Sequence, residues 1–237
     1  MKHVLFVLVA LFCLLMAGCA PREVRYVVGV SQCSDDEWRE QMNKEIRREA
    51  LFYPGVKIDI RTAKDNNAQQ IADIESLIGE GVDLLIVSPN EADAITPVIE
   101  KAYNKGIPVV LVDRKIRSDK YTAYVGADNY EIGRQVGSYI AERLQGKGNL
   151  VEVAGLKAST SALERHRGLM DALRETPDIK LMLRLMLHGS EYRPRKLLVT
   201  FFQNSRILTW FLLIMTEWQP EHTMRPSNSI VSMICCL

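Results

Sequence analysis

Residues 81–114, GVDLLIVSPNEADAITPVIEKAYNKGIPVVLVDR, contain two short apolar runs on either side of an amphipathic stretch. The runs at 82–87 and 107–112 are apolar apart from Asp83, which is typical of strands that are buried on both faces of a sheet. Residues 92–104 between them have the length and apolar spacing of a helix. A strand, a helix and a second strand in this order predict a parallel pair joined by a right-handed crossover.

The same alternation extends in both directions along the chain. Further strands are expected at 24–31, 56–62, 122–126 and 150–154, and further helices at 34–50, 68–79, 130–144 and 161–174. Ser34, with Glu37 three places later, has the form of a capping box and predicts that Ser34 caps the first of these helices. The sequence therefore predicts an α/β fold with doubly wound parallel sheets.

The N-terminal residues read as an export signal. Lys2 and His3 precede an unbroken apolar run at 4–16, and Ala17-Gly18-Cys19 follows. The run is shorter than the roughly 20 residues of a membrane span, and small residues end it, as in secretory signals. Residues 16–19 also resemble the lipobox of bacterial lipoproteins, in which the cysteine carries lipid. We expect lipid attachment at Cys19, or otherwise an uncleaved signal anchor, and in either case a periplasmic domain held at the membrane.

Composition excludes several classes of protein. The 30 Lys and Arg residues balance 29 Asp and Glu residues, so nothing indicates the basic face that nucleic acid demands. The sequence has no phosphate-cradling glycine loop, HExxH, CxxC or nucleophile elbow, so we expect no cofactor, no metal and no enzyme. An enzyme with Asp113 as general base lacks partner groups. Cys33 stands apart from the other cysteines and is expected to be a free thiol or a small buried filler.

Polar side chains follow the expected strands, where ligands of parallel sheets bind. They are neutral hydrogen-bonding groups, a carboxylate, arginines and an indole, which together suit a polyhydroxylated ligand. The candidate ligand-binding residues are Ser31, Trp38, Ser88, Asn90, Asp113, Arg114 and Arg165.

Each candidate has a structural alternative. Trp38 could anchor its helix in the core, and Asp113 with Arg114 could be a surface ion pair. Ser88 and Asn90 could cap the helix at 92–104. Arg165 could be a solvated helix residue. His166 is expected to be packed or exposed rather than a ligand, and the acidic residues at 35–37 to favour a helix N-terminus.

Several motifs in the expected order resemble ribose-type periplasmic binding proteins. They are Ser88-Pro89, then residues 106–109 (GIPV), 112–114 (VDR), 126–129 (GADN) and 160–165 (TSALER). The resemblance covers residues 24–182 and implies a type I periplasmic-binding-protein-like fold with two lobes. It also implies that Asp113, Arg114 and Arg165 hold sugar hydroxyls, that Trp38 stacks on the sugar ring, and that Ser31, Ser88 and Asn90 line the cleft.

The opening of the domain resembles a narrower group. Residues 28–39 (VGVSQCSDDEWR) are similar to the sensor domains of hybrid two-component systems, in which a periplasmic sugar-binding domain controls a cytoplasmic kinase module. This predicts a sensor of a pentose or hexose. The alternative is a lipid-anchored substrate-binding protein of an ABC-type sugar importer, whose partner would be a permease.

The pattern breaks near residue 183. Residues 24–126 supply the first lobe and 127–182 begin the second, but 183–237 have no regular period. A shifted reading frame from residue 208 permits D-L-V-F-A-H-N-D-R-M-A-A-G-A-Y-D-A-A, which resembles the family's next binding strand and helix. We therefore expect residues 183–237 to be a frameshift product, the second lobe to be incomplete, and sugar binding by this chain to be weak or absent.

Overall fold

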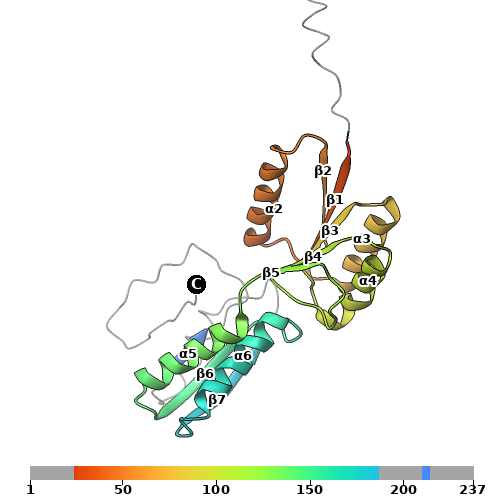
Figure 1. Cartoon of the computed structure of the whole chain (residues 1–237). Coiled ribbons are helices and arrows are strands. Elements are labelled where there is room, and N and C mark those ends of the chain that lie inside the picture. Colours follow the sequence, from red (N-terminus) through yellow and green to blue (C-terminus); the bar gives the residue numbers. More distant parts are fainter. Residues whose placement is uncertain (1–23, 187–209, 214–237) are drawn as a thin grey trace, which may run out of the picture.

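The computed structural model describes residues 24–186 and 210–213, which form two α/β units (Figure 1). The first unit contains β1 (Tyr26–Gln32), α2 (Glu37–Ala50), β2 (Val56–Thr62), α3 (Asn67–Glu80), β3 (Leu84–Val87), α4 (Ala92–Asn104), β4 (Val109–Val112) and β5 (Ala123–Val125). Its five strands are all parallel, in the order β2-β1-β3-β4-β5.

The second unit follows directly after β5. It contains α5 (Asn129–Arg143), β6 (Gly148–Ala154), α6 (Thr160–Leu173), β7 (Ile179–Met186) and β8 (Trp210–Leu213). Its described strands are parallel, in the order β7-β6-β8. Two parallel sheets with crossover helices confirm the predicted α/β class. Strand β7 continues beyond residue 182 and β8 lies in the segment with no regular period, so the sequence pattern indicated neither of these strand positions.

The core of the first unit lies between its sheet and the helices α3 and α4. Leu85, Val87 and Leu111 from the strands are fully buried, and Ile74 of α3 and Ile95 of α4 pack against them. Burying a side chain of this size contributes about 1.5–3 kcal/mol. The apolar runs quoted from residues 81–114 therefore form the centre of this core.

Helix α2 begins differently from the prediction. Its N-cap is Asp36, whose Oδ1 accepts a hydrogen bond from the backbone N–H of Arg39 at 2.9 Å. The hydroxyl of Ser34 instead donates to the carboxylate of Asp36. The predicted capping box is therefore wrong, because the nearer carboxylate takes the capping position and the serine supports it.

Helices α5 and α6 approach each other closely through two glycines. A Cβ at Gly133 would lie 2.0 Å from the carbonyl oxygen of Arg165, and one at Gly168 would lie 2.0 Å from the carbonyl oxygen of Tyr130. Such distances leave no room for any side chain. The contact fixes the position of α6, and with it Arg165, against the start of α5.

The described residues contain neither a candidate membrane-spanning helix nor a candidate metal-binding cluster. Within residues 24–186 and 210–213 no helix is long and apolar enough to cross a membrane. The same part of the chain holds no group of three or more His, Cys, Asp or Glu residues placed to bind a metal ion. The predicted signal at 1–19, with Cys19, lies outside the described residues.

Candidate functional site

Asp113 has an unusual backbone conformation at the end of β4. Its φ is +66°, and the N–H of Arg114 donates to the carbonyl of Val112 at 2.7 Å, which closes a γ-turn centred on Asp113. A positive φ at a residue other than glycine costs roughly 1–3 kcal/mol and occurs preferentially at functional sites. Asp tolerates this region better than most residues. The turn therefore marks Asp113 as a candidate functional residue.

Side chains from both units hold this turn. The hydroxyl of Tyr124 donates to the carbonyl oxygen of Asp113 at 3.0 Å, and that of Ser161 on α6 donates to the same oxygen at 3.2 Å. Burial raises the pKa of Tyr124 to about 12, and the nearby carboxylates of Asp113 and Glu164 add to this effect. Tyr124 is therefore a neutral donor at physiological pH.

The carboxylate of Asp113 is paired with Arg39. One guanidinium nitrogen of Arg39 lies 2.9 Å from Oδ2 of Asp113 and 3.0 Å from Oγ of Ser88, and its Nε lies 3.0 Å from Sγ of Cys33. The side chain of Arg39 is 1% exposed and that of Asp113 is 22% exposed. Burial on its own lowers the pKa of Arg39, but its neighbours Cys33 and Asp113 outweigh this and raise the pKa above its usual value. The pair fixes one carboxylate oxygen of Asp113.

A buried hydrogen-bond network joins the ends of β1 and β3. Nε2 of Gln70, on the first turn of α3, donates to Oγ of Ser31 at 3.3 Å and to the carbonyl of Ser88 at 2.9 Å. Oε1 of Gln70 accepts from the backbone N–H of Asn90 at 2.8 Å. The N-cap of α4 is Glu91, so the alternative that Ser88 or Asn90 caps this helix is wrong.

Arg114 extends this network to β4. Its side chain is 2% exposed, and one terminal nitrogen donates to the carbonyl of Asn90 at 3.2 Å. The Nε of Arg114 and the Oδ1 of Asn90 are buried without a hydrogen-bond partner among the described residues. A buried polar atom without a partner costs about 1–3 kcal/mol, so such atoms are candidates for contacts with a ligand. Nε of Arg114 lies 3.7 Å from Oδ2 of Asp113, so the two side chains do form an ion pair, but the burial of Arg114 means that this is not a surface pair.

The second unit contributes the start of α6. Thr160 accepts a hydrogen bond from the backbone N–H of Lys115 at 2.9 Å, so the two units meet beside Asp113. Arg165 lies one turn after Ser161 on the same face of α6, and its Nε donates to Oδ1 of Asn129 at 2.8 Å. Arg165 therefore lies on the side of α6 that faces the end of β4, rather than on a fully solvated helix face.

The remaining predicted residues have varied surroundings. Trp38 is partly exposed on the first turn of α2, and the guanidinium of Arg39 lies 5.0 Å from its ring centroid. His166 packs in the second unit, where its Nδ1 lies 2.7 Å from the buried carboxylate of Glu152, as expected for a packed histidine. Cys33 is buried and free, as predicted.

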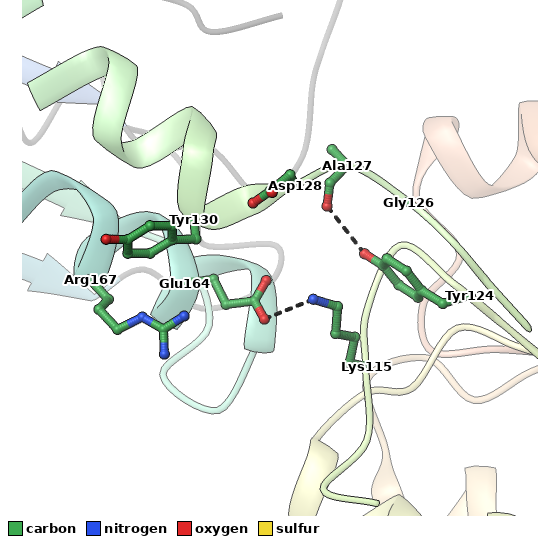
Figure 2. Close-up of a pocket in the computed structure, with 8 residues that line it drawn as sticks. All are labelled: Lys115, Tyr124, Gly126, Ala127, Asp128, Tyr130, Glu164 and Arg167. Atoms are coloured by element: carbon green, nitrogen blue, oxygen red, sulfur yellow. Dashed lines mark hydrogen bonds and ion pairs between the residues drawn. The ribbon is translucent and has the colours of Figure 1, made fainter. Parts of the chain in front are cut away.

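A hollow of about 470 Å³ lies beside the junction of the two units (Figure 2). None of the seven predicted ligand-binding residues lines it. Figure 2 shows Lys115 bonded to Glu164 across the junction, and Arg167 lies 4.9 Å from the ring centroid of Tyr130. Because its charged groups already have partners, the hollow fits an interlobe space better than a ligand site. Its lining residues are Lys115, Tyr124, Gly126, Ala127, Asp128, Tyr130, Glu164 and Arg167.

Sequence reasoning missed Arg39, Gln70 and Tyr124. Arg39 and Gln70 sit in amphipathic helices, where polar residues are expected to face water. Arg39 also contacts the nearby Cys33, but the contacts with Ser88 and Asp113 that bury it, and those of Gln70 with Ser31 and Ser88, span 18 to 74 positions, so no local pattern indicates their burial. Tyr124 lies within a predicted strand, and the only signal was its position close to the GADN motif.

Comparison with known proteins places the chain in a family. Residues 27–186 match the periplasmic binding protein domain family. A galactofuranose-binding protein of Escherichia coli is 32% identical over 172 residues, which cover 70% of this chain and 52% of that protein. A ribose import binding protein of Bacillus subtilis is 32% identical over 127 residues, or 54% of this chain and 41% of that one. The chain thus spans about half the length of these curated relatives.

Solved structures agree. The fructose-binding periplasmic domain of a hybrid two-component system is 52% identical, with a TM-score of 0.72, over 80% of this chain and 63% of that one. The periplasmic binding protein of an arabinose ABC transporter from Shewanella, bound to arabinofuranose, is 26% identical with a TM-score of 0.69, over 78% and 64% of the two chains. The resemblance predicted from the motifs is confirmed, and the chain belongs to the periplasmic binding protein domain family.

Proposed function

We propose that the described residues form the ligand-binding part of an extracytoplasmic receptor that senses a small sugar for a hybrid two-component signalling system. One observation carries the proposal. The ends of β3 and β4 present two buried polar atoms without a hydrogen-bond partner among the described residues, Oδ1 of Asn90 and Nε of Arg114, and the latter lies 3.7 Å from the carboxylate of Asp113. This is a binding role, not a catalytic one.

The chemistry of this cluster suits vicinal hydroxyl groups. The free Oδ1 of Asn90 accepts a hydrogen bond, the Nε of Arg114 donates one, and a carboxylate such as Asp113 accepts two. Arg165 adds a guanidinium from the other lobe, and the partly exposed ring of Trp38 offers an apolar face for a sugar ring. Ser31 and Ser88 support the cluster from beneath through Gln70.

The ligand class is a sugar in its furanose form, with fructose as the first candidate. Three similar proteins support this choice: the structure named for fructose, the galactofuranose-binding protein and the arabinofuranose complex. The relative at 52% identity is a sensor domain, whereas the relatives named for import are 32% identical or less. This difference favours a kinase module as partner over an ABC permease.

In this proposal, residues 1–19 export the domain and attach it to the membrane. The apolar run at 4–16 and Cys19 would export the chain and hold it at the membrane, through lipid on Cys19 or through an uncleaved signal anchor. The domain boundaries follow: a first lobe at 24–126, a second lobe at 127–182, and a tail at 183–237 read out of frame. The family match ends at residue 186, a few positions past the proposed start of the tail, which supports a break in this region. Sequencing the DNA across codons 178–187 tests it.

A sugar panel tests the binding role. Ligand-observed NMR of the full chain with fructose, arabinose, galactose and myo-inositol reports weak binding directly. We expect saturation transfer to the sugars that form furanose rings and none to myo-inositol, whose carbocycle cannot. Asp113→Asn should abolish the transfer. Equal transfer to myo-inositol, or transfer that survives in the variant, would overturn the assignment.

A further inference from the structure

Five exposed apolar side chains gather at one end of the first lobe. Leu51 and Phe52 are each 73% exposed, Tyr53 is 56%, Tyr26 is 58% and Val24 is 54% exposed. They make up half of the ten large apolar side chains that are exposed in the described residues. Single exposed apolar residues are ordinary, but a cluster of this kind usually marks a contact surface. This group is called the apolar patch below.

Backbone contacts hold the patch together. The N–H of Tyr26 donates to the carbonyl of Gly55 at 3.0 Å, and the N–H of Val56 donates to the carbonyl of Tyr53 at 3.1 Å. The start of β1 therefore lies against the turn that joins α2 to β2, at one end of the first lobe (Figure 1). This end carries the amino ends of the strands, so β1, seven residues long, separates it by about 20 Å from the ligand-binding cluster.

The occupant of the patch follows from the chain that enters it. Cys19, the expected lipid site, precedes Val24 by only five positions. A fully extended segment of that length spans at most about 17 Å. Lipid on Cys19 would therefore keep the patch within about 17 Å of the membrane, and tyrosine and other amphipathic rings favour the level of the lipid headgroups.

Charge around the patch fits the same occupant. Arg47 and Arg48 are exposed in the last turn of α2, and Arg25 and Lys57 are exposed on the flanking strands. Acidic groups lie among them too: Glu49 is exposed, Glu45 pairs with Arg48 at 2.5 Å, and the exposed Asp83 accepts a hydrogen bond from the backbone N–H of Val27 at 2.7 Å. Basic residues beside an apolar surface are attracted by anionic lipid headgroups, with about 1 kcal/mol for each residue near the surface.

We infer that the apolar patch rests on the lipid bilayer, so that the first lobe is docked on the membrane and the second lobe is free to move. The inference rests on the proposed membrane attachment. Docking explains why the apolar patch lies where the chain enters the lobe from Cys19. It also leaves the ligand-binding cluster facing away from the lipid.

A reporter tryptophan in the patch tests this docking. The full chain carrying Phe52→Trp is reconstituted in vesicles of phosphatidylethanolamine and phosphatidylglycerol, with and without bromine on the upper acyl chains. Emission of the unsubstituted chain is subtracted. Because docked apolar residues sit about 5–10 Å into the interface, we expect bromine to lower the reporter emission at least about twofold. Tyr139→Trp, at an exposed position of α5 in the second lobe, is the matched control and should be unaffected.

Two further measurements separate docking from attachment. Co-sedimentation of the full chain with vesicles reports membrane attachment of any kind, and the part of it that is lost in Cys19→Ser reports attachment through lipid. Co-sedimentation with an unquenched reporter overturns the docking and leaves the attachment standing, and an unquenched reporter without co-sedimentation overturns both. Quenching in the Cys19→Ser chain supports docking independently of lipid. A blue-shifted but unquenched reporter with a doubled mass would mean that a second copy covers the patch, which also overturns the inference.

Discussion

Replacing Arg39 by methionine removes the cation at the centre of the candidate site. The guanidinium of Arg39 contacts Cys33, Ser88 and Asp113 at 3.0, 3.0 and 2.9 Å, and its side chain is 1% exposed. Methionine fills a similar volume but leaves Asp113 with only the more distant guanidinium of Arg114, whose Nε lies 3.7 Å from Oδ2, as a countercharge. The cost is therefore the loss of the ion pair and its hydrogen bonds, with little contribution from a cavity.

The magnitude follows from the burial of the two partners. Removing one member of a fully buried pair costs about 3–5 kcal/mol, because the other charge is left unpaired. Asp113 is 22% exposed, so water screens part of its charge, and we expect a loss of about 3 kcal/mol in the free energy of unfolding. Arg39→Lys keeps the charge but not the planar fork, and we expect about half of that loss.

Urea unfolding of the full chain, followed by circular dichroism, measures both effects. Arg134→Met is the matched control, because Arg134 pairs with Glu131 on the surface of α5 with half of its side chain exposed, and its unfolding midpoint should not change. A loss below about 1 kcal/mol for Arg39→Met, which is the range of surface ion pairs, would refute the reasoning. It would mean that Arg39 is not the buried partner of Asp113.

Three further perturbations follow from the geometry. Gly133→Ala should destabilise the second lobe by about 1–3 kcal/mol in spite of better helix propensity, because its Cβ would lie 2.0 Å from the carbonyl oxygen of Arg165. Gly79→Ala, whose Cβ would have nothing within 4 Å, should instead stabilise the fold by up to about 1 kcal/mol. Thermal unfolding of both variants measures the difference. Below pH 10 the Tyr124 phenol is protonated in both the folded and the unfolded state, but above pH 10 the unfolded state loses this proton first. The free energy of unfolding should therefore fall as pH rises from 10 to about 12, and Tyr124→Phe should flatten this part of the pH profile of the urea midpoint. A profile that the substitution leaves unchanged would contradict a buried phenol. Lys115→Met should lower the free energy of unfolding by less than about 1 kcal/mol, because its ion pair with Glu164 is partly exposed. It should nevertheless enlarge the radius of gyration in X-ray scattering, because this ion pair, at 3.0 Å, joins the two lobes. An unchanged radius would show that other contacts hold the lobes together.

The strands and helices of the first lobe could be predicted from local patterns. Each predicted strand between 24 and 126 became a parallel strand, and the central strands β1, β3 and β4 were indicated by apolar runs of the kind that burial in a parallel sheet produces. The boundaries were less secure. Ser34 has the right spacing for a cap, but Asp36 displaces it, since two acceptors within three residues compete for the same N–H groups.

The candidate site was predicted in part. Asp113, Arg114, Ser88 and Asn90 follow strands directly, and topology alone brings such positions to one edge of a sheet. Arg39 could not be predicted, because its burial depends on Ser88 and Asp113, which are 49 and 74 positions away. The γ-turn at Asp113 was equally hidden, since aspartate is common in many turns.

The packing of α5 against α6 was also outside the reach of periodicity. Gly133 and Gly168 look like ordinary helix-weakening residues in the sequence. In the structure each one admits a backbone carbonyl of the opposite helix, which places Arg165 beside Asn129. A glycine in a helix carries this meaning only when its neighbour in space is known.

Titration of the full chain with fructose, followed by NMR up to high sugar concentrations, tests the central claim most directly. The account predicts saturable but weak binding, with a dissociation constant on the order of millimolar, or about −4 kcal/mol. Asp113→Asn and Arg165→Met should each weaken it at least about tenfold, because a charged hydrogen bond to the sugar contributes about 1.5–3 kcal/mol. Lys101→Met, which removes an exposed ion pair between α4 and Glu75 of α3, should leave it unchanged. Binding that ignores Asp113 and Arg165, or no saturable binding at all, would contradict the account, and a micromolar dissociation constant would contradict the out-of-frame tail.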